Sequence, residues 1–387
     1  MSLASPKHLS DLSELRVAIG VTRLVQARSG HDGIDHYTQE LYARLPVRDR
    51  LPVAFGAVAH STLSRVELTR WPDYRWAGMS SALTGLPFLV GDDLSGRADL
   101  FHAPDHFIPK LRDVPVVATL HDAVPVSHPH WTSSGMRRLK NWLWLRSSQW
   151  AQHIITISEF SRGEIAHHFR IEEDKISVTP LGVDERYFER LCGEEAEQAV
   201  AGLSLPERFF MFVGTFQPRK NIERIVDAHE ALPTALRKAV PLLIVGRNGW
   251  GADELVARLR AYGPDGDVRW LQNVGDVAKR VMMQRATALV FPSLLEGFGL
   301  PVLEGFASQT PVITSNVTSL PEVAGNAAWL VDPYSVPALT EAMVTLARED
   351  AVGRDLVAKG LVRARQFTWD ACARQTVQVY EQVLSKS

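Results

Sequence analysis

The sequence predicts an α/β protein with two consecutive strand–helix domains. Short apolar segments rich in β-branched residues alternate with helical stretches along most of the chain. A polar, acidic stretch over residues 193–208 interrupts this alternation, which then starts again. Strands that are buried on both faces and separated by helices are typical of parallel sheets. We therefore expect two Rossmann-like domains whose strand ends face a central cleft.

The predicted strands fall into two groups. Before residue 190 they are 16–21, 115–120, 153–157 and 175–178. After residue 208 they are 209–213, 241–245, 268–271, 288–291 and 312–314. The segment 335–385 is predicted to be helical, and one face of its last helix carries Trp369, Ala373, Val377, Tyr380 and Leu384.

This order of elements suggests how the chain is divided. We expect an N-terminal domain over residues 1–190, a linker over 191–206 and a C-terminal domain over 207–365. Residues 366–387 would form a C-terminal helix that braces the domains.

Composition and charge exclude several classes of protein. The 387 residues are 45% hydrophobic and 22% charged, which excludes a disordered chain. The net charge of -2 argues against a nucleic-acid partner. The two cysteines, Cys192 and Cys372, form neither a disulfide framework nor a zinc motif and fit a reducing cytoplasm. Without an apolar signal core or a run of about 18 apolar residues, we expect a cytoplasmic protein with at most peripheral contact with the inner face of the plasma membrane.

The most informative stretch is FPSLLEGFGLPVLEGFASQTPVITS at 291–315. It predicts a strand, a glycine-rich loop, a helix and another strand. Gly297 and Gly299 let backbone N–H groups approach a ligand, and Pro301 suits the first turn of a helix. The N-terminus of that helix is a phosphate site. Glu296 in the loop and Glu304 in the helix could each accept hydroxyl hydrogen bonds, or Glu304 could cap backbone groups and Glu296 could be solvated.

Two further clusters follow predicted strands. Arg219 and Lys220, in the loop between the strand 209–213 and an amphipathic helix, could neutralise a diphosphate or be two solvated cations. His121 ends the strand 115–120 and would point into the same cleft, unless it is a packed or hydrogen-bonded histidine.

Three other segments allow two interpretations each. The D-G-D at 265–267 imitates a metal-binding motif, but it lies between Gly263-Pro264 and a strand, which favours a turn, and we expect no metal. The G-R-N-G-W-G beginning at Gly246 lacks dinucleotide-loop spacing and more plausibly ends a strand near the nucleotide. The basic, tryptophan-rich segment 136–150 suits a packed helix or attachment to anionic lipid.

Taken together, these motifs resemble the GT-B family of retaining, nucleotide-sugar-dependent glycosyltransferases called family 4. The resemblance covers nearly the whole chain and rests on landmarks in a fixed order. They are the loop from Gly30 to Tyr37, T-L-H-D at 119–122, I-T-I-S-E-F-S at 155–161, T-P-L-G-V-D at 179–184, G-T-F-Q-P-R-K-N at 214–221 and E-G-F-G-L-P-V-L-E at 296–304.

The resemblance implies a role for each site residue. Glu304 would bind ribose hydroxyls, Arg219 and Lys220 the diphosphate, and Glu296 the hydroxyls of the transferred sugar. The backbone amides of Gly299 and Leu300 would bind the distal phosphate. His121 would contact the sugar near the reacting carbon, and the loop at Gly33 the donor phosphate or the acceptor. The full donor-binding set that we expect is Gly33, Gly214, Thr215, Arg219, Lys220, Gly246, Glu296, Gly297, Phe298, Gly299, Leu300 and Glu304, with His121 and Glu296 as catalytic residues.

One position departs from the family pattern. Thr215 stands where many relatives place Arg directly after the glycine of the diphosphate loop, so Arg219 and Lys220 would carry most of the charge compensation. The implied reaction is attack of an acceptor hydroxyl on the anomeric carbon with retention of configuration, without a metal or other cofactor. A donor phosphate oxygen would help to deprotonate the acceptor.

The resemblance implies an enzyme that transfers a hexose from a nucleotide-diphosphate sugar to a glycan acceptor, which we expect to be lipid-linked, in bacterial polysaccharide or O-antigen synthesis. The P-R-K-N sequence at 218–221 resembles mannosyl- and rhamnosyltransferases and points to GDP-mannose. Two alternatives stay open: a non-catalytic nucleotide-sugar-binding subunit, and an epimerase or phosphorylase on the same fold.

Overall fold

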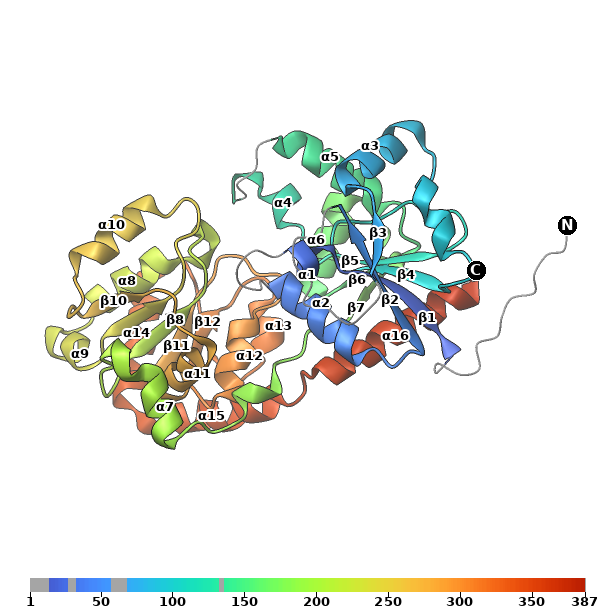
Figure 1. Cartoon of the computed structure of the whole chain (residues 1–387). Helices are drawn as coiled ribbons and strands as arrows, with labels where there is room; N and C mark the ends of the chain where they lie inside the picture. Colours follow the sequence, from blue (N-terminus) through green and yellow to red (C-terminus); the bar gives the residue numbers. More distant parts are fainter. Residues whose placement is uncertain (1–13, 27–32, 57–67, 132–135, 387) are drawn as a thin grey trace, which may run out of the picture. The chain divides into compact units, whose positions relative to one another are not determined.

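The chain forms two compact units, which are coloured along the sequence in Figure 1. The structure is a computed structural model, and it describes residues 14–26, 33–56, 68–131 and 136–386. Unit 1 contains Met1–Gly182 and Trp369–Ser387, and unit 2 contains Val183–Thr368. Each unit is an α/β domain built on its own parallel sheet, as the alternation of strands and helices predicts.

Unit 1 has a seven-stranded sheet in the order β3-β2-β1-β4-β5-β6-β7, and every pair of neighbours is parallel. The strands are β1 (Arg16–Gly20), β2 (Asp49–Phe55), β3 (Thr69–Trp71), β4 (Leu100–Ala103), β5 (Val116–Thr119), β6 (His153–Thr156) and β7 (Ile176–Val178). The α-helices of its described part are α1 (Thr22–Gln26), α2 (Gly33–Arg44), α3 (Tyr74–Thr84), α4 (Val124–Ser127), α5 (Arg137–Ser148), α6 (Glu159–Phe169) and α16 (Trp369–Lys386).

Unit 2 has a six-stranded parallel sheet in the order β10-β9-β8-β11-β12-β13. The strands are β8 (Phe210–Val213), β9 (Leu242–Val245), β10 (Val268–Leu271), β11 (Ala288–Phe291), β12 (Val312–Ser315) and β13 (Trp329–Val331). The α-helices are α7 (Gly193–Val200), α8 (Ile222–Glu230), α9 (Thr234–Ala239), α10 (Asp253–Ala261), α11 (Asp276–Arg285), α12 (Leu300–Ala307), α13 (Leu320–Ala324), α14 (Val336–Arg348) and α15 (Asp350–Ala364).

The strand order places the loops that carry the predicted site. In unit 2 the chain runs outward from β8 to β9 and β10, and then returns to the other side of β8 with β11. Ligands of open parallel sheets bind at such a switch point, beyond the carboxyl ends of the strands. The loops that follow β8 and β11 contain the G-T-F-Q-P-R-K-N and E-G-F-G motifs. In unit 1 the corresponding reversal lies between β1 and β4, and His121 follows the neighbouring β5.

Four strands were not predicted, and each lacks a long β-branched run. β3 and β13 are three-residue strands at the edges of their sheets, and β4 has four residues. β2 contains Pro52, which cannot donate to the sheet, opposite Ile19 of β1. β3, β4 and β13 are too short, and β2 too irregular, to be predicted from their own residues, because packing against neighbouring strands determines whether such segments form strands.

The observed domain division differs from the predicted one both at the boundary near residue 190 and at the C-terminal helix. The boundary lies at residues 182 and 183, not at 190. The expected linker 191–206 forms α7 and a short 3-10 helix in unit 2, where α7 packs on α11. The acidic residues of α7 are exposed, whereas Ala196 and Val200 are buried. Because so few apolar residues mark its buried face, this amphipathic helix was predicted to be a polar linker. The C-terminal helix α16 belongs to unit 1, where it packs on α2 and β6.

Candidate active site

The loops after β8 and β9 approach each other closely through glycines. A Cβ atom on Gly246 would lie 1.9 Å from the carbonyl oxygen of Gly214, so only glycine fits there. The Gly214 N–H donates to Val245 and the Gly246 N–H to Leu271. Because both amides are used within the sheet, neither can donate to a phosphate. The structure therefore gives the N–H groups of Gly214 and Gly246 a structural role, while their predicted place in the donor-binding set stays a prediction. Thr215 follows Gly214 as a half-buried loop residue.

The loop after β11 is fixed by the residues that follow β12. The Ser319 hydroxyl lies 2.9 Å from the carbonyl oxygens of both Glu296 and Phe298. The Thr318 hydroxyl accepts from the Glu296 N–H at 3.3 Å, and the Ser315 hydroxyl donates to Ser293. These contacts hold the backbone of the E-G-F-G loop before any ligand arrives.

Three predicted site residues meet in one buried ion cluster. Arg219 Nη1 lies 2.7 Å from Glu296 Oε2, and Lys220 Nζ lies 2.6 Å from Glu296 Oε1. Glu296 is 7% exposed, and the cation side chains are 19% and 13% exposed. The interpretations of a solvated Glu296 and of two solvated loop cations are therefore wrong.

The charges in this cluster fix the ionisation of the carboxylate. Burial alone would raise the pKa of Glu296, but Arg219 and Lys220 outweigh burial and lower it to about 2. Lys220 Nζ also lies 4.7 Å from the centre of the Phe291 ring, over its face. Two cations and one carboxylate leave the cluster with one net positive charge, which suits it to an anionic ligand.

Asn221 ends the P-R-K-N motif, but the sequence analysis gave it no role of its own. It has a φ of 60°, in the left-handed region that Asn tolerates, and it is 4% exposed. Its side-chain amide donates to the carbonyl oxygens of Pro292 and Pro333. Asn221 thereby links the loop after β8 to the end of β11, and its place directly after Arg219 and Lys220 was the only signal for it.

The E-G-F-G loop leads into α12 through a glycine whose backbone conformation would strain any other residue. Gly299 has a φ of 115°, and a Cβ atom there would lie 2.7 Å from Leu320. The N–H groups of Gly299 and Leu300 donate to no other residue in the described part of the chain. Gly297 lies buried in the same loop, and the Phe298 ring packs edge-on against Phe367, so Phe298 can reach a ligand only through its backbone.

Glu304 lies on α12 and is half-buried. Its carboxylate forms no ion pair with any residue that the structure describes, and it interacts with the hydroxyl of Tyr187. It does not cap the helix with its side chain, because the cap at Gly299 involves no side-chain hydrogen bond. Glu304 is therefore a carboxylate with open acceptor positions near the N-terminus of α12.

In unit 1, His121 follows β5 and is half-buried. Its Nε2 lies 3.1 Å from the carbonyl oxygen of Pro104. Because a carbonyl oxygen only accepts, Nε2 carries a proton and donates it to this bond. The ring of Tyr37 stands edge-on to His121, with centres 4.8 Å apart. The contacts with Pro104 and Tyr37 thus fix the orientation of the His121 ring, and its position after a strand matches the prediction.

A buried polar chain lies behind His121, and sequence reasoning missed it. The Tyr37 hydroxyl lies 2.9 Å from Thr119 Oγ1, which lies 2.8 Å from His102 Nε2. His102 Nδ1 in turn contacts the hydroxyl of Tyr380 on α16. Burial lowers the pKa of His102 to about 3, so His102 is neutral in this chain. Tyr37 and Tyr380, at the two ends of this chain of hydrogen bonds, lie far apart in the sequence, so their connection could not be predicted from it.

The loop at Gly33 and the D-G-D sequence are the remaining predicted sites. Gly33 is the first residue of α2, while 27–32, including Gly30, lie outside the described residues. Asp267 of the D-G-D sequence forms an ion pair with Arg237. Within the described ranges, no group of three or more His, Cys, Asp or Glu side chains could hold a metal ion. No helix in that part of the chain is long and apolar enough to cross a membrane.

Comparisons with known proteins identify the family of the chain. The family model "Glycosyl transferases group 1" matches residues 194–360, and "Glycosyltransferase Family 4" matches residues 66–187. The O-antigen chain mannosyltransferase B of Escherichia coli is 33% identical over 282 residues, which are 73% of this chain and 74% of that protein. An MMP alpha-(1->4)-mannosyltransferase of Mycolicibacterium hassiacum is 28% identical over 70% of this chain and 66% of its own length.

A solved structure supports the fold. The sucrose-phosphate synthase of Thermosynechococcus elongatus superposes with a TM-score of 0.73, at 22% identity, over 97% of this chain and 100% of that one. The two parallel sheets, the family models and the mannosyltransferase relative lead to one conclusion. The chain is a glycosyltransferase of the GT-B fold and belongs to family 4.

Proposed function

We propose that this enzyme transfers mannose from GDP-mannose to a lipid-linked glycan acceptor in bacterial O-antigen or polysaccharide synthesis. The observation that carries the proposal is the buried cluster of Arg219, Lys220 and Glu296, which lies beside the N-terminus of α12 and bears a net positive charge. Mannose is favoured because two relatives that act on different acceptors are both named mannosyltransferases. O-antigen synthesis is favoured by the name of the first of them.

The donor would bind through its two phosphate groups and through the hydroxyls of its ribose and its sugar. Arg219 and Lys220 hold the diphosphate, with Arg offering a planar fork and Lys a compact charge. The N–H groups of Gly299 and Leu300 reach the distal phosphate at the start of α12. Glu304 accepts from the ribose hydroxyls. When the diphosphate arrives it shares the two cations with Glu296, so that Glu296 can accept hydrogen bonds from the sugar.

The transfer step would proceed with retention and without a metal. An acceptor hydroxyl attacks the anomeric carbon while the bond to the diphosphate breaks, and the hydroxyl proton passes to a donor phosphate oxygen. Arg219 and Lys220 stabilise the charge that develops on the leaving diphosphate. His121 contacts the sugar near the reacting carbon, and its protonated Nε2 is held by Pro104, which fixes the ring.

A lipid-linked acceptor is delivered at a membrane, and one surface of unit 1 suits such a contact. Helix α5 packs inward through Leu143 and Trp144, but Met136, Leu139 and Trp142 are exposed. The neighbouring α3 packs against α5, as Figure 1 also shows. We define the α3–α5 surface by its exposed apolar side chains, which are Trp76, Leu83, Leu86, Met136, Leu139 and Trp142.

The basic residues around this surface favour an anionic partner. Neither α3 nor α5 contains an acidic residue, whereas α5 carries Arg137, Arg138, Lys140 and Arg146. Exposed apolar side chains surrounded by cations are typical of contact with an anionic lipid interface. We therefore place this surface on the inner face of the plasma membrane during acceptor binding.

Calorimetry with a panel of nucleotides tests the donor assignment. GDP-mannose and GDP should bind to the purified enzyme, and UDP-glucose should bind at least tenfold more weakly. A donor with another base or sugar that binds more tightly than GDP-mannose would overturn the assignment of GDP-mannose while leaving the diphosphate site in place.

A further inference from the structure

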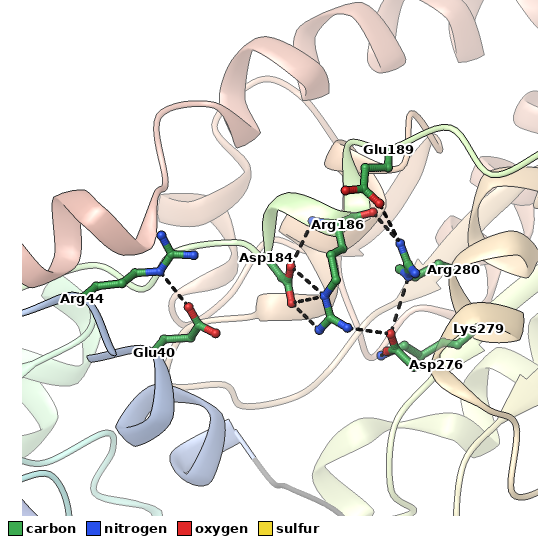
Figure 2. A network of polar contacts seen from close by, with 8 residues as sticks. All are labelled: Glu40, Arg44, Asp184, Arg186, Glu189, Asp276, Lys279 and Arg280. Carbon is green, nitrogen blue, oxygen red and sulfur yellow. Dashed lines mark hydrogen bonds and ion pairs between the residues drawn. The ribbon is translucent and has the colours of Figure 1, made fainter. Parts of the chain in front are cut away.

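The segment between residues 183 and 191 is pinned to α11 by ion pairs. Arg186 pairs with Asp184 in its own segment and with Asp276 at the start of α11, at 3.2 Å for the second pair. From α11, Arg280 donates to the backbone carbonyl of Arg186 at 2.8 Å and pairs with Glu189. Figure 2 shows these side chains pointing toward one another. The backbone on either side of residue 187 is therefore held in place.

Tyr187 lies inside this pinned segment with an unused donor. The residue is 4% exposed, and its hydroxyl oxygen is buried without a hydrogen-bond partner among the described residues. Its ring makes a cation–π contact with Lys279, whose Nζ lies 5.3 Å from the ring centre. Buried hydroxyl groups are nearly always hydrogen-bonded, so an unpaired one in a well-held segment needs an explanation.

The nearest explanation is Glu304. Burial raises the pKa of Tyr187 well above its ordinary value, and the Glu304 carboxylate raises it further, ahead of Asp276 and Asp184. The hydroxyl thus keeps its proton and remains a donor. The Tyr187 hydroxyl lies within reach of a hydrogen bond to the Glu304 carboxylate, which forms no ion pair with a described residue. A buried donor without a close hydrogen bond therefore lies beside a carboxylate that can accept from it.

We propose that Tyr187 is a positioning residue for Glu304. Its hydroxyl donates to one carboxylate oxygen and leaves the other oxygen for the two ribose hydroxyls of the donor nucleotide. A carboxylate that is oriented before binding loses less conformational freedom when the ribose arrives. This inference rests on the proposed role of Glu304 in ribose binding.

The test removes only the hydroxyl, with Tyr187→Phe. Calorimetry compares GDP with its 2′,3′-dideoxy analogue, which lacks the groups that Glu304 would bind. We expect GDP affinity to fall about five- to tenfold, which is the loss typical of one hydrogen bond. The affinity for the analogue should stay within about twofold. Adding Tyr187→Phe to Glu304→Gln should cause no further loss, because the two side chains act through one contact.

A matched control and a melting curve separate the outcomes. Tyr262→Phe, also in unit 2, removes a hydroxyl that donates to Glu230 and should leave GDP affinity unchanged. If Glu304→Gln keeps the preference for GDP over the analogue, the ribose assignment fails. If Glu304→Gln abolishes that preference but Tyr187→Phe binds GDP like the wild type, only the inference about Tyr187 fails. If Tyr187→Phe lowers the melting temperature equally in the wild-type and the Glu304→Gln background, the hydroxyl has a partner other than Glu304, which also overturns the inference.

Discussion

Glu296→Gln should destabilise unit 2 by an amount that depends on pH. The pKa of Glu296 is lowered from 4.5 to about 2, mainly by Arg219 and Lys220 acting against burial. A shift of about two and a half pH units corresponds to about 3 kcal/mol at about 1.4 kcal/mol per unit. Because the pKa is depressed in the folded state, this stabilisation is fully present above about pH 5 and is lost as the pH falls toward 2.

The pH dependence isolates the carboxylate from other effects of the substitution. Between pH 7 and pH 3, the wild-type contribution should fall from about 3 to about 1 kcal/mol. The difference in unfolding free energy between wild type and Glu296→Gln should shrink by the same amount, about 2 kcal/mol. Costs of the substitution that do not involve titration stay constant and cancel.

Urea unfolding at several pH values measures this difference, and amide hydrogen exchange of β11 and α12 reports unit 2 directly. The matched control is Glu304→Gln, which removes a carboxylate of α12 that forms no ion pair with a described residue. A pH dependence that both variants share would not come from the cluster of Arg219, Lys220 and Glu296. A difference for Glu296→Gln that stays constant from pH 7 to pH 3 would refute the ion cluster.

Three further predictions concern ligands. Lys220→Ala should weaken GDP binding by about 1 to 3 kcal/mol, the range for hydrogen bonds to charged groups, and an unchanged affinity by calorimetry would reject the diphosphate contact. His121→Ala should leave GDP binding unchanged but lower kcat about ten- to a thousandfold, and wild-type turnover of the folded variant would remove it from the site. Replacing Arg137, Arg138 and Lys140 by Gln should reduce sedimentation with anionic vesicles at an unchanged Tm, whereas a lower Tm with full vesicle binding would favour a packing role.

The sequence predicted the fold well where local pattern and burial agree. The strand 288–291 was predicted at its observed bounds, because a parallel strand buried on both faces is apolar throughout. The half-buried edge strand 268–271 was also predicted at its bounds, although it contains Arg269. The edge strand β13 was missed, since three residues carry too little pattern. Helix α7 was taken for a linker because only Ala196 and Val200 are buried among exposed acidic neighbours.

The site was predicted residue by residue but not as a set of contacts. The motifs pointed to Arg219, Lys220 and Glu296 separately, but their pairing spans 76 or 77 positions and follows only from the placement of β8 beside β11. Tyr187 gave no signal, because it lies in a segment without a ligand motif and owes its significance to Glu304 on another element. Long-range pairing of this kind is a property of the packed chain.

The most direct test of the central claim is a product balance. The purified enzyme is incubated with GDP-mannose and a lipid-linked glycan acceptor, and GDP and mannosylated acceptor are quantified over the same time course. We predict that the two form in equal amounts and that the new linkage keeps the configuration of the donor. Release of GDP without mannosylated acceptor, or conversion of the donor to another nucleotide sugar without release of GDP, would contradict the account.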